Sequence, residues 1–568
     1  MVRTFGWVQD AASLRKLRLV VEIFVPGSST HKQLDGRIRQ LVFTEELQDR
    51  FLTELSRKPM SLQYRDLVGS HTSPRAMSPC DGIIQAAIPG QRREYLTDWP
   101  SDNYLRWAHC LGFVEYHVST DSFSATPSAE ELAGSEAGSG DEHKILETAL
   151  LSYPPVMRCL ELLRDGDHLT KFDIGNQLGF VGEEGFTSLP LGIFIRDLTQ
   201  IQDSSERNSL VANSEGTSDK YARMIAGWCK QMGWLEQSPK LVEVQVASQN
   251  YSYTLGQAYT ITSLGLSARR KGLGTNINST IPKNVFWEML ATKSLNRNYV
   301  RSRRAHIVKA LQVRARTLPN LQRLLEDAGF IENLATIADD LRGLLNIGLR
   351  IEESAGQFNL RDKVVGLAIP RIETRKDDLQ ALIDGCRERL TTVPHEYLVL
   401  IELSVSGKES MLFEAKTVEL FISQFGFLGE HLGGPDKPDG IVYSDIQGHD
   451  DFGVIIDTKA YADGFNISAP ERRKMTDYVD QNIRRHGSGW WDGFPGNVSE
   501  YRFLFVSSGF IGGYKAALER IKQTTNTSGA AISALNLLLL ANEFQENKIS
   551  LIDLKGILGA QDEIRVLV

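Results

Sequence analysis

The stretch "KPDGIVYSDIQGHDDFGVIIDTKAY", residues Lys437–Tyr461, sets two carboxylates and a lysine into two apolar segments. Its segments "GIVYS" and "FGVIIDTKAY" are rich in β-branched and aromatic residues, and the polar "DIQGHDD" separates them. This pattern predicts a β-hairpin with a long loop. The charged residues of interest, Asp439, Asp457 and Lys459, lie on or beside its strands.

The pairing of the two strands decides whether these side chains meet. If Tyr443 pairs with Phe452, Asp439 lies opposite Ile456 and Asp457 is its diagonal neighbour. Asp457 and Lys459 are two residues apart, so their side chains leave the same face of the strand. We therefore expect the two carboxylates and the lysine to lie close together.

Such a cluster suits phosphodiester chemistry. Two Asp carboxylates and a carbonyl form a hard oxygen site for Mg²⁺, and a lysine beside it can orient a water and offset charge on the phosphate. This is the P-D-x(n)-[D/E]-x-K pattern of nucleases. The alternative is a turn at "PDG" and an ordinary ion pair between Asp457 and Lys459. An apolar strand with charges on one face needs groups that compensate them, which favours the metal-site interpretation.

The whole chain indicates a multidomain protein. At 568 residues it is too long for one core, and its length predicts about three to five domains. The N-terminal "MVRTFGWVQD" lacks the apolar segment of a signal peptide, and the longest apolar run, "ALNLLLLA", is too short to span a bilayer. We therefore expect a cytoplasmic protein without membrane association.

Other chemistries find little support. The five cysteines are scattered without a C-x-x-C pair, which argues against a disulfide framework and a zinc site. No P-loop, nucleophile elbow or H-E-x-x-H helix occurs. The net charge of -8 does not indicate a nucleic-acid binder. Two basic clusters, Ser267–Gly272 and Arg301–Lys309, are nevertheless candidates for phosphate contact, although most such clusters are solvated surfaces.

A repeated pattern occupies the first two thirds of the chain. An amphipathic helix stops at a glycine and two short strands follow, at Tyr104–Thr126, at Tyr221–Gln237 with Ala258–Thr262, and at Ile337–Arg361. Gly112, Gly233 and Gly348 stand where a helix C-cap needs a left-handed residue. Segments with helix-turn-helix spacing, Leu169–Leu189 and Leu318–Ile337, precede the second and third units. This order is typical of winged-helix modules, and generic helix hairpins are the alternative.

Two segments read as joints between domains. Thr126–Lys144 is rich in Ser, Gly, Ala and Glu and lacks aromatic residues, which is typical of a linker. Ile369–Gln380 changes from apolar to charged and leads into an amphipathic helix. We place the start of the last domain there.

The second unit contains a candidate recognition helix, predicted to start at Thr217 or Ser218. Lys220 and Arg223 share an exposed face in its first turns, where a recognition helix reaches base edges in the major groove. Two exposed cations are common on helices, so a solvated surface stays open as an interpretation. The core face is expected at Tyr221, Ile225, Trp228 and Met232.

Distinctive motifs are spread along the chain: "RTFGWVQ", "PCDGIIQA", "LRWAHCLGF", "LTKFDIGNQLGF", "SDKYARMIAGW", "VFWEMLAT", "VPHEYL", "HLGGPDKPDGIVY", "DTKAY" and "FLFVSSGF". In this order they resemble the FokI family of type IIS restriction endonucleases, nearly from end to end. The resemblance implies an α+β multidomain protein, in which three tandem winged-helix-like subdomains precede an α/β PD-(D/E)XK nuclease domain. The expected parts are subdomain 1 (1–133), a linker (134–144), subdomain 2 (145–280), subdomain 3 (281–368), a linker (369–380) and the cleavage domain (381–568).

The resemblance also implies an activity. In this family the first two subdomains read an asymmetric site in double-stranded DNA, and the third packs against the cleavage domain. The cleavage domain has no sequence preference, and it cuts both strands at a fixed distance after pairing with a second copy. The matching motifs assign catalysis to Asp439, Asp457 and Lys459, with Mg²⁺ held by the two aspartates. A cognate DNA methyltransferase is expected in the same system.

Matching positions also suggest the DNA contacts, which are Gln9, Arg75, Trp99, Asn213, Glu215, Lys220 and Arg223. Arginine and lysine suit guanine and asparagine suits adenine, so the set fits a site of the 5'-GGATG-3' kind. Asp10 departs from the family pattern, which has asparagine after this glutamine. A carboxylate only accepts hydrogen bonds, so Asp10 favours a cytosine amino group. The identity of one base pair of the site therefore stays open.

The helix after the hairpin, Ala469–Asn482, is the expected pairing surface. Arg473 and Asp477 lie four residues apart, and taken alone they read as an exposed bridge within the helix. The family carries an acid and an arginine there in swapped order and uses them across the dimer. A two-fold interface accepts either order, so we expect reciprocal bridges. A strand-specific nicking enzyme and a DNA-binding regulator with a silent nuclease domain remain the alternative functions.

Overall fold

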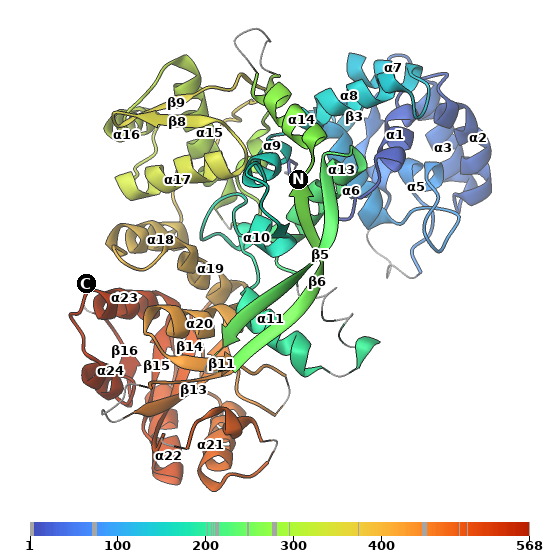
Figure 1. Ribbon diagram of the computed structural model, residues 1–568. Coiled ribbons are helices and arrows are strands. Elements are labelled where there is room, and N and C mark those ends of the chain that lie inside the picture. Colours follow the sequence, from blue (N-terminus) through green and yellow to red (C-terminus); the bar gives the residue numbers. More distant parts are fainter. Residues whose placement is uncertain are drawn as a thin grey trace.

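The computed structural model describes residues 5–566 except 71–76, 202, 206, 208–209, 211–214, 247–248, 275–280, 295, 373, 435, 446–450, 488 and 497. Three helix-rich subdomains come first in the chain, and an α/β domain follows (Figure 1). The long hairpin β5–β6 reaches from the subdomains toward the α/β domain (Figure 1). None of the helices in these described residues is long and apolar enough to cross a membrane.

Subdomain 1 begins with helices whose starts are capped by hydroxyl side chains. Ser13, Ser28 and Thr44 each accept a hydrogen bond from a backbone N–H in the first turn that follows. Its elements are α1 (Leu14–Ile23), α2 (Ser29–Leu41), α3 (Glu45–Ser56), β1 (Leu62–Gln63), α4 (Tyr64–Val68), α5 (Ile83–Ala87), α6 (Asp98–Cys110), β2 (Val114–His117) and β3 (Ser122–Ala125). Helix α6 with β2 and β3 confirms the first predicted helix and wing.

The predicted linker is largely helical. Helices α7 (Pro127–Gly134) and α8 (Gly140–Leu151) occupy most of Thr126–Lys144. Ala129 and Leu132 are buried, and Arg18 bonds to both Ser135 and Glu142. The small and polar residues of this segment are typical of a linker. Two buried apolar residues and one long-range ion pair are nevertheless enough to pack its short helices against subdomain 1.

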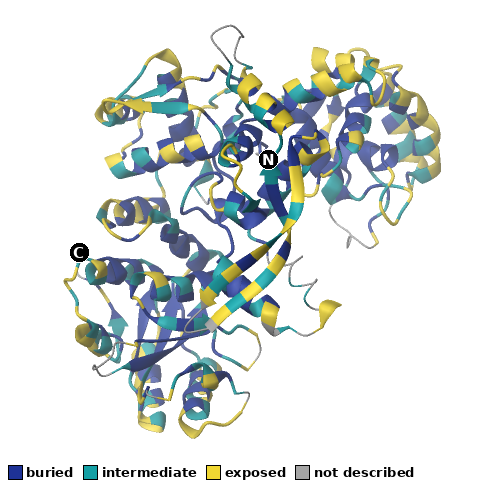
Figure 2. Cartoon of the chain, in the orientation of Figure 1, coloured by how far each residue is buried: buried dark blue, intermediate teal, exposed yellow. Residues whose placement is uncertain are grey.

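Subdomain 2 has a much longer wing than predicted. Its elements are α9 (Pro154–Leu162), β4 (Leu169–Thr170), α10 (Lys171–Gly175), η1 (Glu184–Phe186), α11 (Leu191–Gln200), α13 (Thr217–Gln231), β5 (Leu235–Val246), β6 (Gln249–Ile261) and α14 (Ser263–Leu273). Buried and exposed positions alternate along the hairpin (Figure 2), where Val242 and Leu255 pack inward. Leu169–Leu189 contains one short helix and a 3-10 turn, and the predicted helix-turn-helix is wrong at this place.

Subdomain 3 confirms the third unit. Its elements are β7 (Lys283–Asn284), η2 (Trp287–Leu290), α15 (Arg297–Val313), α16 (Leu318–Asp327), α17 (Leu334–Asn346), β8 (Ile351–Ser354), β9 (Gln357–Leu360) and β10 (Val364–Val365). The glycines predicted to end the three unit helices have positive φ angles of 78°, 73° and 103° at Gly112, Gly233 and Gly348. The basic cluster of α15 is not a phosphate surface, because Arg301, Arg303 and Arg304 are buried.

The α/β domain is a six-stranded sheet with helices on both faces. The strand order is β11-β12-β13-β14-β15-β16, antiparallel at the β11–β12–β13 end and parallel from β13 onward. The strands are β11 (Leu428–His431), β12 (Gly440–Tyr443), β13 (Phe452–Lys459), β14 (Glu500–Ser507), β15 (Gly529–Ser533) and β16 (Glu563–Ile564). The helices are α18 (Asp378–Arg389), η3 (His395–Leu398), α19 (Val399–Ser406), α20 (Ser410–Gln424), α21 (Ala469–Arg484), η4 (Trp490–Gly493), α22 (Tyr514–Thr525), α23 (Ala534–Gln545) and α24 (Leu551–Ile557).

The hairpin of β12 and β13 is confirmed, but its predicted register is wrong by one residue. Tyr443 pairs with Gly453 instead of Phe452, and Gly440 pairs with Ile456. A one-residue slip moves a whole strand face to the other side of the sheet. The strands are buried on both faces, so no alternation of polar residues marks the correct register.

Candidate functional site

Asp457 and Lys459 project toward helix α21. Side chains alternate along β13, and Ile455 packs in the cluster that contains the buried residues of α21 and α22. Val454 and Ile456 pack on the other face, with residues of α20 and α23. Asp457 and Lys459 follow Ile455 by two and four residues along the strand, so their side chains lie on the same face of the sheet as that of Ile455.

Asp439 joins them from the start of β12. Its backbone N–H donates to the Ile456 carbonyl at 3.0 Å. Its carboxylate Oδ2 accepts from the Thr458 backbone N–H at 2.6 Å and from the Thr458 hydroxyl at 2.9 Å. Lys459 Nζ lies 2.7 Å from Asp457 Oδ2. The structure thus brings together the three residues that the hairpin argument singled out.

The charges of the cluster act on one another. Burial, followed by the negative charge of Asp457, raises the pKa of Asp439 to about 7. Burial alone would lower the pKa of Lys459, but the charges of Asp457 and Asp439 outweigh it and raise that pKa. Lys459 is therefore a cation, and it offsets part of the repulsion between the two acids.

The residues present fit a hard cation. Asp457 is 2% exposed, and its Oδ1 has no hydrogen-bond partner in the described part of the chain. A pocket of about 370 Å³ adjoins the cluster, and it is lined by residues that include Asp439, Lys459, Glu414 and Lys474. No group of three or more His, Cys, Asp or Glu residues suited to a metal occurs among the described residues. Two carboxylates, with water and phosphate oxygens, are ordinary ligands for Mg²⁺.

Three of the predicted DNA contacts, Gln9, Asp10 and Trp99, lie close together in subdomain 1. The Trp99 indole N–H donates to Asp10 Oδ2 at 2.6 Å. Asp10 has a φ of 57°, a region that aspartate and asparagine tolerate better than other residues. The Gln9 backbone N–H donates to Asn103 Oδ1 at 3.0 Å. Arg75 and Asn213 lie outside the described residues.

Helix α13 begins at Thr217 as predicted, and its predicted core face is buried. Lys220 and Arg223 are half-buried, which corrects the expectation of a fully exposed pair. Glu215 is buried between two cations: Arg223 Nε donates to its Oε1 at 3.0 Å, and Lys171 Nζ also contacts it. Sequence reasoning missed Lys171, because the pairing spans 44 positions and leaves no local pattern.

The segment that carries Gln9 and Asp10 packs against helix α13. The Trp228 indole of α13 donates to the Ala11 carbonyl at 2.7 Å, and Gln231 accepts from the Leu14 N–H at 3.1 Å. The Trp7 and Tyr221 rings lie 5.0 Å apart. The segment before α1 therefore lies along α13, from Tyr221 to Gln231.

Helix α21 presents two faces, as predicted. Met475, Tyr478 and Val479 are buried, and Pro470 stands in the first turn. Arg473 and Asp477 are exposed. Neither makes an ion pair with another residue of the described chain, so both charges are available to a partner surface.

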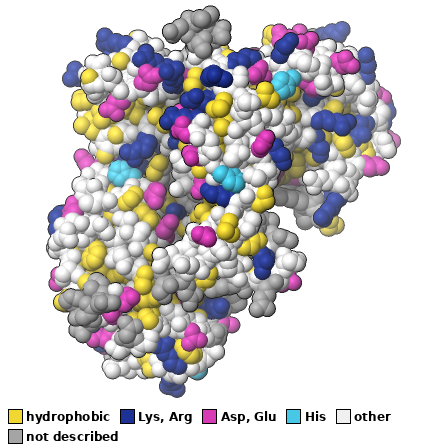
Figure 3. Space-filling model, viewed as in Figure 1, with side chains coloured by type: hydrophobic (Ala, Val, Ile, Leu, Met, Phe, Trp, Pro, Cys, Tyr) yellow, Lys and Arg dark blue, Asp and Glu magenta, His cyan; other side chains and the backbone are white. Residues whose placement is uncertain are grey.

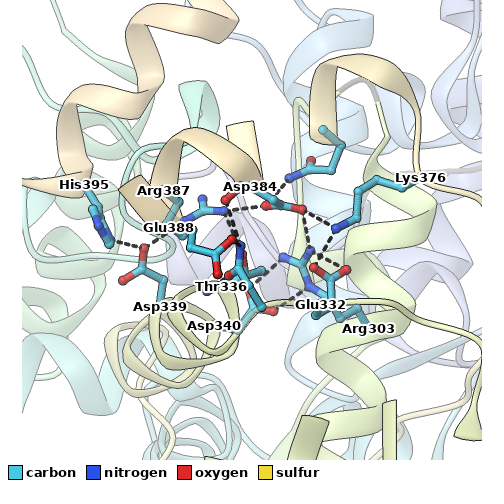
Figure 4. A network of polar contacts seen from close by, with 12 residues as sticks. Arg303, Glu332, Thr336, Asp339, Asp340, Lys376, Asp384, Arg387, Glu388 and His395 are labelled. Carbon is cyan, nitrogen blue, oxygen red and sulfur yellow. Dashed lines mark hydrogen bonds and ion pairs between the residues drawn. The ribbon is translucent and has the colours of Figure 1, made fainter. Parts of the chain in front are cut away.

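A buried ionic network joins subdomain 3 to the α/β domain (Figure 4). Arg303 Nη1 of α15 lies 3.6 Å from Asp384 Oδ2 of α18, and Lys376 Nζ lies 2.8 Å from Glu332 Oε2. Arg387 Nε of α18 lies 2.9 Å from Asp339 Oδ2 of α17. Arg303, Lys376 and Arg387, with burial opposing them, lower the pKa of Asp384 to about 2. The basic cluster of α15 therefore has a structural role in this interface.

A second junction links the α/β domain to subdomain 2. Glu402 of α19 is buried, and its Oε2 accepts from the Glu184 backbone N–H at 2.7 Å. Arg196 of α11 donates to the His431 carbonyl at 2.6 Å. Residues of α11 and of the β5–β6 hairpin share a hydrophobic cluster with the α/β domain. The domain is thus docked against both neighbouring subdomains.

The surface shows no segregation of charge on the face in Figure 3, where Lys and Arg side chains intermingle with Asp and Glu. This mixture agrees with the net charge of -8. The net charge and this face therefore do not mark out a surface for nucleic acid.

Comparison with known proteins covers the chain from end to end. Four family models match: "FokI, recognition domain, subdomain 1" over residues 3–135, "FokI, recognition domain, subdomain 2" over 142–275, "FokI, D3 domain" over 290–356, and "FokI, cleavage domain" over 376–565. The candidate cluster lies within the last of these.

Individual relatives agree. The chain is 40% identical over 552 residues to the type II restriction enzyme FokI of Planomicrobium okeanokoites, covering 95% of each chain. It is 32% identical over 573 residues to the type II restriction enzyme StsI of Streptococcus sanguinis, covering 96% of this chain and 93% of the relative. The structure superimposes on FokI bound to DNA with a TM-score of 0.94 at 38% identity, and on FokI alone with 0.92 at 37%. Both matches cover 100% of each chain.

Proposed function

The chain belongs to the FokI family of type II restriction endonucleases, and from that premise we propose how it acts on double-stranded DNA. It binds an asymmetric site of the GGATG kind and hydrolyses one phosphodiester bond in each strand at a fixed distance outside the site. Cleavage requires Mg²⁺ and the transient pairing of two cleavage domains. The observation that carries the proposal is the ion pair of Asp457 with Lys459, with Asp439 close enough for its charge to act on both, beside an open pocket.

Asp439 and Asp457 hold the cation in this proposal. Mg²⁺ bound there would polarise a phosphoryl oxygen and lower the pKa of a coordinated water. Asp439 accepts two hydrogen bonds from Thr458, which fix its carboxylate. Burial and the charge of Asp457 raise the pKa of Asp439 to about 7, so above that pH its carboxylate is ionised and can serve as a ligand. Lys459 orients the attacking water and offsets negative charge on the phosphate.

In this proposal the first two subdomains, residues 1–133 and 145–280, recognise the bases of the DNA site. Lys220 and Arg223 contact guanine edges, Asn213 contacts adenine, and Gln9, Arg75 and Trp99 complete the surface. Glu215 holds the Arg223 guanidinium in place, as its two contacts with that group suggest. Asp10 accepts from a cytosine amino group, since a carboxylate offers only acceptors. Residues 281–368 pack against the cleavage domain, residues 381–568.

Pairing of two cleavage domains uses the exposed face of α21. Arg473 of one copy bridges to Asp477 of the other, and the two-fold axis repeats the contact. The protein acts in the cytoplasm beside a DNA methyltransferase that protects its own sites.

The test is digestion of a supercoiled plasmid that carries candidate sites, with Mg²⁺ and without it. We expect linear product with Mg²⁺. Nicked circles alone would identify a strand-specific nicking enzyme, and unchanged plasmid would identify a DNA-binding regulator. Asp457→Ala should abolish cleavage and leave specific binding within a few-fold, because the cluster and the readout residues lie in separate domains. Near wild-type cleavage by this variant would remove Asp457 from the site.

A further inference from the structure

The hydroxyl of Tyr478 is buried without a partner. Tyr478 lies on α21 and is 2% exposed, with its ring 6.2 Å from that of Trp490. Its hydroxyl oxygen has no hydrogen-bond partner in the described part of the chain. An unpaired buried polar group is destabilising, so it calls for an explanation.

The surroundings of this hydroxyl point to the cleavage cluster. Asp457 and Lys459 project to the face of the sheet that α21 covers, where Tyr478 packs with Ile455. Asp457 Oδ1 is a second buried atom without a partner in the described residues, while Oδ2 is bound by Lys459. Lys474, whose Nζ lies 5.6 Å from the Tyr478 ring centre, lines the same pocket as Asp439.

The charge around Tyr478 determines what it can do. Burial, followed by the negative charges of Asp457 and Asp439, raises the pKa of Tyr478 well above its ordinary value. The phenol therefore stays protonated, and near two carboxylates it acts as a hydrogen-bond donor. Its neighbour Asp457 Oδ1 can only accept.

We propose that Tyr478 is a positioning residue of the cleavage site, whose hydroxyl donates through one water molecule toward Asp457 Oδ1. A water in this place would satisfy both buried atoms. The contact would hold the Asp457 carboxylate in the orientation that binds the cation. This inference rests on the proposed Mg²⁺-dependent cleavage and deepens the account of the same site.

The placement has a consequence for pairing. Tyr478 directly follows Asp477, which lies on the exposed face of the same helix. Helix α21 thus connects the proposed pairing surface with a catalytic carboxylate through adjacent residues. A second copy that shifts α21 would shift the hydroxyl as well.

The test compares Tyr478→Phe with Tyr397→Phe in the full-length protein. Tyr397 is a buried tyrosine of the same domain whose hydroxyl lies 2.7 Å from the Ser423 hydroxyl, away from the cluster. Three quantities are measured: the Mg²⁺ concentration for half-maximal plasmid cleavage, the affinity for Ca²⁺ by calorimetry, and the urea midpoint of the metal-free protein. Partners that orient a metal ligand typically change metal affinity by about 10- to 100-fold when removed.

We expect Tyr478→Phe to need about tenfold more Mg²⁺ and to bind Ca²⁺ about tenfold more weakly, with an unchanged or higher urea midpoint. Tyr397→Phe should lower the midpoint and leave both metal responses as in the wild type. Wild-type metal responses in Tyr478→Phe would overturn the inference, and so would a midpoint loss as large as that of Tyr397→Phe. Failure of the wild-type protein to cleave with Mg²⁺ would instead refute the proposed function.

Discussion

Replacing Glu402 by glutamine should remove the pH dependence of the docking between the cleavage domain and subdomain 2. Glu402 is buried where the cleavage domain meets subdomain 2, and it faces Glu183, Glu184 and Arg304. Burial, followed by the charge of Glu183, raises the pKa of Glu402 to about 8. The docked state therefore holds a proton that the undocked state releases.

The sign and the size follow from linkage. The ordinary pKa is 4.5, so stabilisation of docking is fully present below that pH and is lost as the pH rises to about 8. At about 1.36 kcal/mol per unit, the loss is on the order of 3 kcal/mol at neutral pH and on the order of 5 kcal/mol above pH 8. Glutamine keeps an oxygen that can accept from the Glu184 N–H, and it does not ionise.

Limited trypsin digestion measures the docking, because Arg371, Arg375 and Lys376 lie in the joint between subdomain 3 and the cleavage domain. In the wild type, cleavage at the joint should accelerate between about pH 5 and about pH 8, and Glu402→Gln should stay protected. The matched control is Glu409→Gln, which removes an ion pair with Lys293, a residue of subdomain 3 that also pairs with Glu184, and which should keep the wild-type response to pH. Equal pH dependence in the wild type and Glu402→Gln would refute the reasoning.

Three further predictions concern readout, cleavage and pairing. Lys220→Ala should weaken specific binding by about 1–3 kcal/mol and relax selection at one base pair, as footprints on variant sites can show; equal loss on random DNA would make Lys220 a phosphate contact. Residues 377–568 expressed alone should degrade DNA slowly without site preference, and discrete fragments on a gel would place base readout in this domain. Asp477→Arg should suppress double-strand cleavage of plasmid, and mixing it with Arg473→Asp should restore it, because both contacts of the mixed pair then join opposite charges; full cutting by Asp477→Arg alone would exclude this interface.

Local features of the fold were predictable because their causes are local. Helix α13 starts at Thr217 and its core face repeats with helical spacing, so periodicity and capping are enough. Gly112 ends its helix with a positive φ that few other residues adopt. The hairpin of β12 and β13 follows from β-branched runs on either side of a polar segment.

The candidate cluster was predictable in its members but not in its geometry. The spacing of Asp457 and Lys459 places both on one face whatever the strand pairs with. The pairing itself needs the whole sheet, because β12 and β13 are buried on both faces and fit more than one register. The pocket beside Lys459 depends on residues of α20 and α21, which are distant in sequence.

The sequence by itself determined the family, the order of the subdomains and the identity of the clustered acids and lysine, because these depend on local pattern and motif. Only the tertiary structure decided which charges are buried. Arg303 reads as a surface cation until Asp340 and Glu332 are placed around it, and the sequence gives no sign that Lys171 pairs with Glu215. Burial and long-range ion pairing depend on contacts between residues far apart in the chain, and no local pattern records them.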